Sequence, residues 1–78
     1  MSVEVRLPQW GMGMTEGTVV KWLKEVGDQV EAGEPIVEIE AAKATSEVNA
    51  PVAGTLTERM YEEDDTVEVQ AVLAIITP

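Results

Sequence analysis

One lysine of this chain stands between two stretches of alternating residues. Lys43 lies within residues 36–51, IVEIEAAKATSEVNAP, where apolar side chains alternate with polar ones before and after it. Alternation with a period of two is typical of a half-buried β-strand, and two such runs around a short break predict a β-hairpin. Lys43 would lie at the tip of this hairpin, where a long side chain can be presented to another protein.

A short helix is the competing interpretation. Residues 40–44, EAAKA, have high helix propensity, but an isolated helix needs about 12–15 residues to offset its nucleation. Pro51 also disfavours helical conformation in the residue before it. The predicted hairpin register is Val37 opposite Val48 and Glu38 opposite Glu47. Because like charges directly opposite each other are unfavourable, the rest of the fold must hold the hairpin together.

The residue types restrict the chemistry that this lysine can perform. An exposed lysine is protonated near neutral pH and is a poor nucleophile unless burial or a cationic neighbour activates it. The nearest predicted charges, Glu40 and Glu47, favour the ammonium form. Lys21 and Lys24 are the other lysines, and both fall inside a predicted strand. We therefore expect Lys43 to act through its position, and we do not expect the domain to be an enzyme by itself.

Composition excludes several classes of function. The net charge is −10, from 15 acidic and 5 basic residues, which argues against nucleic acid and anionic membrane surfaces as partners. Cysteine and histidine are absent, which removes thiol and imidazole nucleophiles and the usual zinc ligands. The acidic run 62–65 is interpreted as a solvated turn, so no metal site is predicted. We expect a location in the bacterial cytoplasm, with the mitochondrial matrix as the less favoured alternative.

The chain contains an internal repeat. A shift of 37 residues places residues 17–40 on residues 54–77 without a gap and keeps both apolar and turn positions. We predict a single domain, residues 1–78, made of two similar units packed face to face. The repeat also predicts that both chain ends lie at one end of the domain and Lys43 at the other.

Turn signals divide the sequence into eight short strands. The predicted strands are 3–7, 17–25, 29–31, 36–41, 44–49, 54–61, 66–68 and 72–77. Such a series predicts an all-β fold, a flattened barrel or sandwich of two antiparallel sheets. The glycine-containing loop 9–16 carries Trp10, Met12 and Met14. These side chains either cap the end of the core or form an exposed surface for binding.

Several motifs together resemble the lipoyl domains of 2-oxo acid dehydrogenase complexes over almost the whole chain. The motifs are Gly17 followed by Trp22, Gly27-Asp28-x-Val30, Ile39-Glu40-x-x-Lys43-Ala44 and Ala50-Pro51-Val52-x-Gly54. The resemblance implies a flattened barrel of two four-stranded sheets with quasi-twofold symmetry. It also implies that Lys43 carries lipoic acid in amide linkage, as the swinging arm of a dihydrolipoamide acyltransferase (E2). The run 8–19 is most similar to the first lipoyl domain of E2 chains, including those of acetoin dehydrogenase.

The same resemblance implies the partners. They are a lipoate-attaching enzyme, a thiamine-dependent dehydrogenase (E1) that would reductively acylate the lipoyl group, the E2 acyltransferase core, and a flavoprotein (E3) that would reoxidise it. Recognition would involve two groups of residues around the attachment site. These are the hairpin residues Glu40, Ala41, Ala42, Ala44 and Thr45, and the loop residues Trp10, Met12 and Met14.

The chain departs from the lipoyl pattern just before the lysine. Ala41-Ala42 stands where lipoyl domains commonly have Thr-Asp. The loss of the acidic residue before the lysine bears on recognition by the dehydrogenase more than on modification of the lysine. Related biotinyl domains have Ala-Met before their lysine and Met after it, and Ala44 does not match that Met. A biotin carrier of a carboxylase therefore stays open as an alternative, as does an unmodified module that only binds proteins.

Overall fold

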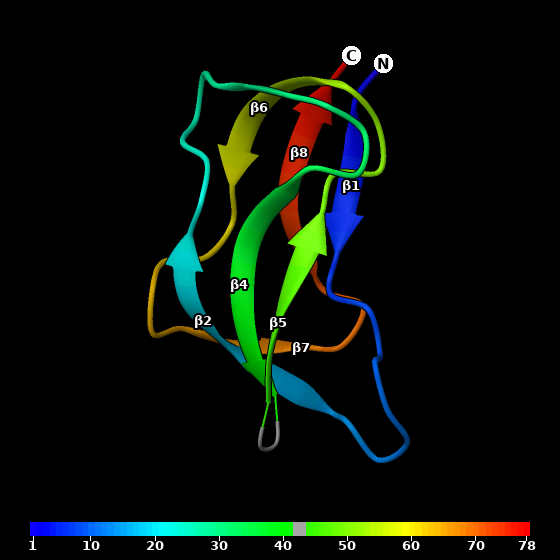
Figure 1. Cartoon of the computed structure of the whole chain (residues 1–78), viewed down its shortest axis with the longest axis vertical. Helices are drawn as coiled ribbons and strands as arrows, with labels where there is room; N and C mark the ends of the chain where they lie inside the picture. Colours follow the sequence, from blue (N-terminus) through cyan, green and yellow to red (C-terminus); the bar gives the residue numbers. More distant parts are fainter. Residues whose placement is uncertain (42–43) are drawn as a thin grey trace.

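The chain folds into two packed β-sheets (Figure 1). The structure, a computed structural model, describes residues 1–41 and 44–78. Its strands are β1 Val3–Arg6, β2 Glu16–Trp22, β3 Gln29–Val30, β4 Pro35–Ala41, β5 Ala44–Asn49, β6 Gly54–Arg59, β7 Thr66–Glu68 and β8 Val72–Thr77. They form two antiparallel four-stranded sheets, ordered β1-β8-β6-β3 and β5-β4-β2-β7. The predicted all-β fold class is confirmed.

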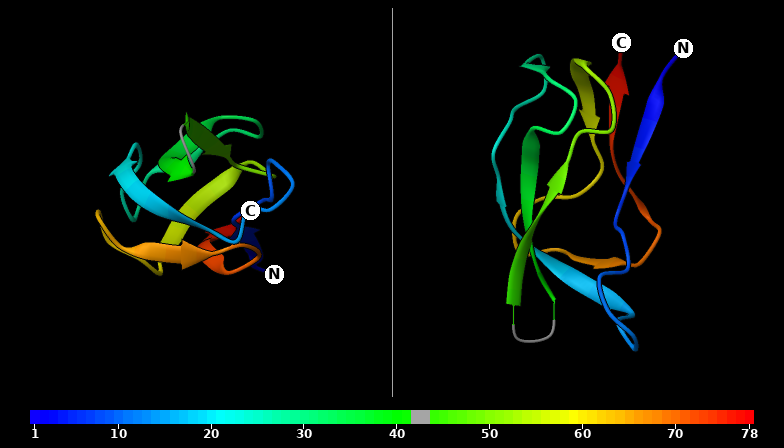
Figure 2. Two further views of the ribbon diagram at one scale, coloured as in Figure 1. Left: turned by 90° about the horizontal axis from the view of Figure 1, so that it is seen from below. Right: turned by 45° about the vertical axis from the view of Figure 1, so that its right-hand side comes forward.

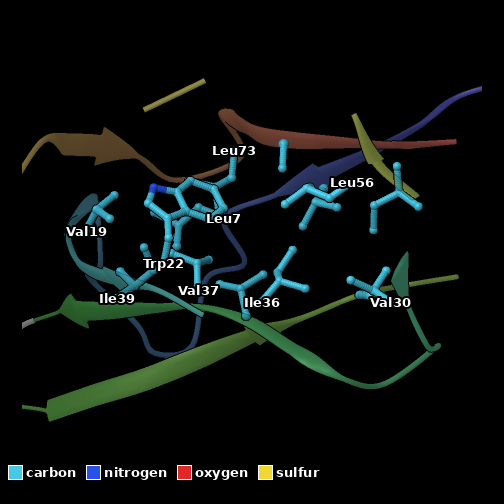
Figure 3. Packing of buried hydrophobic residues seen from close by; sticks show 14 of the residues in the cluster. Leu7, Val19, Trp22, Val30, Ile36, Val37, Ile39, Leu56 and Leu73 are labelled. Carbon is cyan, nitrogen blue, oxygen red and sulfur yellow. The ribbon is translucent and has the colours of Figure 1, made fainter. Parts of the chain in front are cut away.

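The core lies between the two sheets (Figure 3). Alternation along the strands turns one face of each sheet inward, and residues of both sheets meet there. The largest fully buried side chains are Leu7, Ile36, Ile39, Leu56, Leu73, Ile76, Val19, Val37 and Val67. Burying one such side chain contributes about 1.5–3 kcal/mol, so this single cluster can hold a small domain without disulfides.

The two halves of the chain make equivalent backbone contacts 37 residues apart. The Leu23 N–H donates to Ile36 O at 2.8 Å, and the Met60 N–H donates to Leu73 O at 2.9 Å. Strand β2 pairs with β4 as β6 pairs with β8, and a register shift occurs at the same place in each pair. The short strands are exchanged between the halves, because β3 pairs with β6 and β7 pairs with β2.

Two strands end earlier than their sequences predict. The predictions 17–25 and 54–61 are wrong at their C-terminal ends, since β2 ends at Trp22 and β6 at Arg59. In each case an aspartate side chain accepts a backbone hydrogen bond just beyond the end of the strand. Asp28 accepts the Glu25 N–H at 2.9 Å, and Asp65 accepts the Glu62 N–H at 2.8 Å. Such local side-chain acceptors compete with ladder hydrogen bonds and turn the chain. The other predicted strands agree with the structure to within one residue at each end.

The chain ends and the β4–β5 hairpin lie at opposite ends of the molecule (Figures 1 and 2). Strand β1 pairs with β8, with Val3 opposite Ile76, which brings the two termini together. Ala41 opposite Ala44 is the last described pair of the hairpin, at the far end of a long dimension of 32 Å. Lys43 lies outside the described residues, but both described neighbours of residues 42–43 are at the predicted end.

Gly54 is expected to be intolerant of any side chain. A Cβ there would stand 2.5 Å from the Thr77 carbonyl oxygen and 2.8 Å from the Pro78 Cα. Because backbone cannot yield as a flexible side chain can, Gly54→Ala should destabilise the fold by about 1–3 kcal/mol. Thermal unfolding checks this as a fall in Tm of several degrees. The control is Gly11→Ala, whose Cβ would meet nothing within 4 Å, and equal Tm values for the two variants would contradict the prediction.

Candidate functional site

The hairpin has the register that its sequence predicts. Val37 lies opposite Val48, with both side chains buried, and Glu38 lies opposite Glu47. Strand β4 is an inner strand of its sheet, hydrogen-bonded to β2 on one side and to β5 on the other. The base of the hairpin is therefore anchored in the core, while Ala41 and Ala44 extend beyond it.

The unfavourable pair in this hairpin has a compensating neighbour. On the other side of β4, the register places Lys21 of β2 opposite Glu38. A cation across from Glu38 offsets the repulsion from Glu47, since cross-strand pairs of opposite charge are stabilising. This relation was not predicted from the sequence, because it depends on which strand lies beside β4.

The described hairpin residues near the attachment position are small or exposed. Glu40, Ala44 and Thr45 are exposed and Ala41 is half-buried, while Ala42 and Lys43 lie outside the described residues. Nothing bulky in the described part of the hairpin would obstruct a long group attached at Lys43. The assignment of Lys43 as the attachment site, and of its neighbours as recognition residues, stays a prediction from the sequence.

The loop 10–14 is partly packed against the core and partly exposed, and its role in binding stays a prediction. Met14 is half-buried and packs against the core, whereas Met12 is 98% exposed and Trp10 is 41% exposed. The loop closes on itself, because the Trp10 N–H donates to Met14 Sδ at 3.5 Å and the Met14 N–H donates to Gly11 O at 3.2 Å. Two large apolar side chains are thus presented on a compact loop.

This loop and the hairpin border a shared, solvent-open hollow. Its volume is about 300 Å³, and it is lined by Trp10, Gly11, Met12, Gly13, Met14, Ala41, Ala44 and Ser46. Figure 2 shows the loop before β2 and the β4–β5 hairpin at the same end of the molecule. The structure therefore places the loop beside the hairpin, as the resemblance implies. Ser46 was missed as a member of this site, although residues two apart on a strand share a face and Ser46 follows Ala44 by two.

Lys24 is engaged elsewhere in the structure. Its Nζ lies 2.8 Å from Oε2 of Glu34, the residue directly before β4, at the base of the hairpin and not at its tip. The hydrogen bond from Lys24, with a second from the Glu31 N–H, holds the pKa of Glu34 below its usual value. The same Lys24–Glu34 hydrogen bond raises the pKa of Lys24.

The ion pair predicts a pH-dependent contribution to stability. Since the pKa of Glu34 is lowered by folding, its contribution should be present above the unfolded value of about 4.3 and be lost as the pH falls through the lowered folded pKa. Glu34→Gln should therefore lower Tm near pH 7 but not at strongly acidic pH. Lys24→Gln, which removes the other partner, should behave in the same way. A Tm difference between parent and Glu34→Gln that persists unchanged into strong acid would contradict this.

The described residues show no separate metal site or membrane-spanning helix. Within residues 1–41 and 44–78, no three carboxylate, imidazole or thiol side chains gather closely enough to hold a metal ion. This part of the chain also has no helix with the length and apolarity needed to cross a membrane.

Comparison with known proteins finds related sequences and folds. A family model described as "Biotin-requiring enzyme" matches residues 3–76. The chain is 48% identical over 75 residues to the dihydrolipoyllysine-residue acetyltransferase component of the pyruvate dehydrogenase complex of Corynebacterium glutamicum, covering 96% of this chain and 11% of that one. It is 40% identical over 70 residues to the corresponding component of the acetoin cleaving system of Pseudomonas putida, covering 90% of this chain and 19% of that one. It thus spans less than a fifth of these relatives.

Two solved structures share this fold. The lipoyl domain of the 2-oxoglutarate dehydrogenase complex of Azotobacter vinelandii matches with a TM-score of 0.79 and 33% identity, covering 97% of this chain and 96% of that one. Urea carboxylase of Kluyveromyces lactis matches with a TM-score of 0.86 and 27% identity, covering 99% of this chain and 6% of that one.

Proposed function

The chain belongs to the family of biotin- and lipoyl-attachment domains, and from that premise we propose that it is a lipoyl carrier domain with lipoic acid on Lys43. The parent protein would be a dihydrolipoyllysine-residue acyltransferase of a 2-oxo acid or acetoin dehydrogenase complex. The observation that carries the proposal is the hairpin register. The last described pair, Ala41 opposite Ala44, leaves only Ala42 and Lys43 between them in the sequence, at the end of the domain remote from both termini.

The described residues suit a long acyl group attached at that position. Ala41 and Ala44, both small, border residues 42–43, and the base of the β4–β5 hairpin is anchored in the core through Val37 and Val48. Lipoic acid, when bound, supplies a redox-active disulfide that can carry an acyl group. In this proposal the domain supplies carriage and recognition, and the bond-making chemistry belongs to the cofactor and to partner enzymes.

The proposed partners are those expected for a carrier domain of a multienzyme system such as the ones to which the relatives belong. The domain would be modified by a lipoate-attaching enzyme and would then visit E1, the E2 core and E3 in turn. The chain ends lie together at the end away from the hairpin, so a linker there would leave the hairpin free to enter each partner. Tethering converts these encounters into intramolecular ones at raised effective concentration.

Intact mass after modification tests the proposal. The protein is incubated with a lipoate ligase and lipoate, and separately with a biotin ligase and biotin, and the modified peptide is mapped. We expect the mass increase of one lipoyl amide, located on Lys43, and little or no biotin.

Biotin attachment is the second candidate, favoured by the close match to a carboxylase domain. Efficient biotinylation of Lys43 without lipoylation would replace our proposal with a biotin carrier. An unmodified Lys43 in protein from its native host would instead support a module that only binds proteins.

A further inference from the structure

The hollow beside the hairpin has a chemical character unlike the rest of the surface. The chain carries a net charge of −10, yet none of the described residues that line this hollow is charged. It is lined by one tryptophan, two methionines, two alanines, two glycines and one serine. Its volume, about 300 Å³, is at the lower end of the range of small-molecule sites in proteins, roughly 300–1,000 Å³.

We propose that this hollow is a resting seat for the dithiolane end of a lipoyl group on Lys43, so that the arm alternates between a seated and an extended position. This inference rests on the proposed function. It adds to that function a specific place on the domain where the carried group is held between visits to partner enzymes.

Covalent connectivity favours this occupant over any other. Ala44 is bonded directly to Lys43 and Ala41 is separated from it by one residue, and both alanines line the hollow. A group attached at Lys43 is therefore confined close to the hollow's wall. Confinement of this kind gives effective concentrations in the millimolar range or above, which a partner free in solution rarely reaches.

The walls also match the chemistry of a dithiolane. The ring and its alkyl chain are apolar, and the two sulfur atoms are polarizable. Methionine adapts its shape to irregular neighbours, and sulfur atoms make favourable contacts with aromatic rings. Met12 and Trp10 are exposed at 98% and 41%, so a seated ring would remove from water apolar surface that is otherwise left in contact with it.

The small residues before the lysine contribute to the same site. Ala41 lines the hollow where the resemblance leads one to expect the longer, polar threonine of Thr-Asp. A methyl group keeps that wall apolar and leaves the space open. The departure from the lipoyl pattern thus has a structural consequence at the seat itself.

Nuclear magnetic resonance of the lipoylated protein tests the seat directly. Methionine methyl and tryptophan indole signals are compared before and after complete lipoylation, which intact mass confirms. The methyls of Met12 and Met14 and the Trp10 indole N–H should shift and show contacts to the dithiolane protons. The methyls of Met1 and Met60 and the Trp22 indole should not shift, because none of them lines the hollow.

A pair of matched variants provides the control. Met12→Gln, at a side chain that is 98% exposed, should keep the fold and lose the contacts between its loop and the dithiolane. Met60→Gln, at a second exposed methionine (44% exposed), should keep them. Dithiolane reduction by a small phosphine should be faster in Met12→Gln than in the parent, because less of the arm is shielded.

The possible failures are distinguishable. A fully lipoylated protein whose Met12, Met14 and Trp10 signals do not move would overturn the seat and leave the carrier function intact. Signals that move only when a partner enzyme is added would also overturn it, because the hollow would then be a docking site for that partner. Failure of Lys43 to accept lipoate would overturn both the carrier function and the seat.

Discussion

Lys43→Arg is expected to abolish attachment of lipoic acid and, with it, all acyl transfer through this domain. Arginine keeps the positive charge and a similar length, but its guanidinium stays protonated and cannot take the place of the lysine amine in an amide. No second lysine is available at this end, because Lys21 lies on β2 and Lys24 pairs with Glu34. Intact mass should show complete loss of the lipoyl increment, and reductive acylation by E1 should fall to background.

Conservative changes at the other two lysines serve as controls for this result. Lys21→Arg and Lys24→Arg keep the charges that face Glu38 and Glu34 and should be lipoylated like the parent. A lipoyl increment that persists in Lys43→Arg, or that disappears in either control, would contradict the assignment of Lys43.

Trp22→Ala is expected to remove a large part of the stability of the fold. Trp22 is 8% exposed within the core, its indole N–H donates to Tyr61 O at 2.9 Å, and the Arg59 guanidinium lies 5.2 Å from the ring centroid. Removing a buried tryptophan side chain typically costs about 3–5 kcal/mol. A domain of this length has a total stability of about 4–12 kcal/mol, so the variant should be partly unfolded under mild conditions.

Trp10→Ala is the matched control for the core substitution. The Trp10 side chain is 41% exposed and lies in a loop, so its loss should change the free energy of unfolding by less than about 1 kcal/mol. Urea denaturation followed by circular dichroism measures both variants. Similar midpoints for Trp10→Ala and Trp22→Ala would show that Trp22 does not have the structural role assigned to it.

The sheet topology explains why a loop with no regular structure lies beside the hairpin. Strand β1 belongs to one sheet and β2 to the other, so the chain between them must pass from one sheet to the other. That passage occurs at the end of the molecule where the hairpin emerges (Figure 2). Met14 caps the core there, and Trp10 and Met12 are left beside the hairpin.

The sequence by itself determined the fold class, the hairpin register and the end of the molecule at which the hairpin lies. These features follow from period-two alternation and from the 37-residue repeat, which are visible in the order of residues. The pairs Val37–Val48 and Glu38–Glu47 could be predicted because both strands flank one short break. Lys43 was predicted from its place in that break, and its attachment role is left to experiment.

Only the tertiary structure decided which residues surround the attachment end and where the longer strands stop. Lys21 lies opposite Glu38 because β2 pairs with β4. Strand β2 ends early because Asp28 accepts a backbone hydrogen bond from Glu25. The hollow forms because a loop from one part of the chain crosses beside a hairpin from another. A glycine-containing loop has no periodicity that assigns its side chains to core or solvent, so the exposure of Met12 and the partial burial of Met14 depend on the sheets that the loop connects.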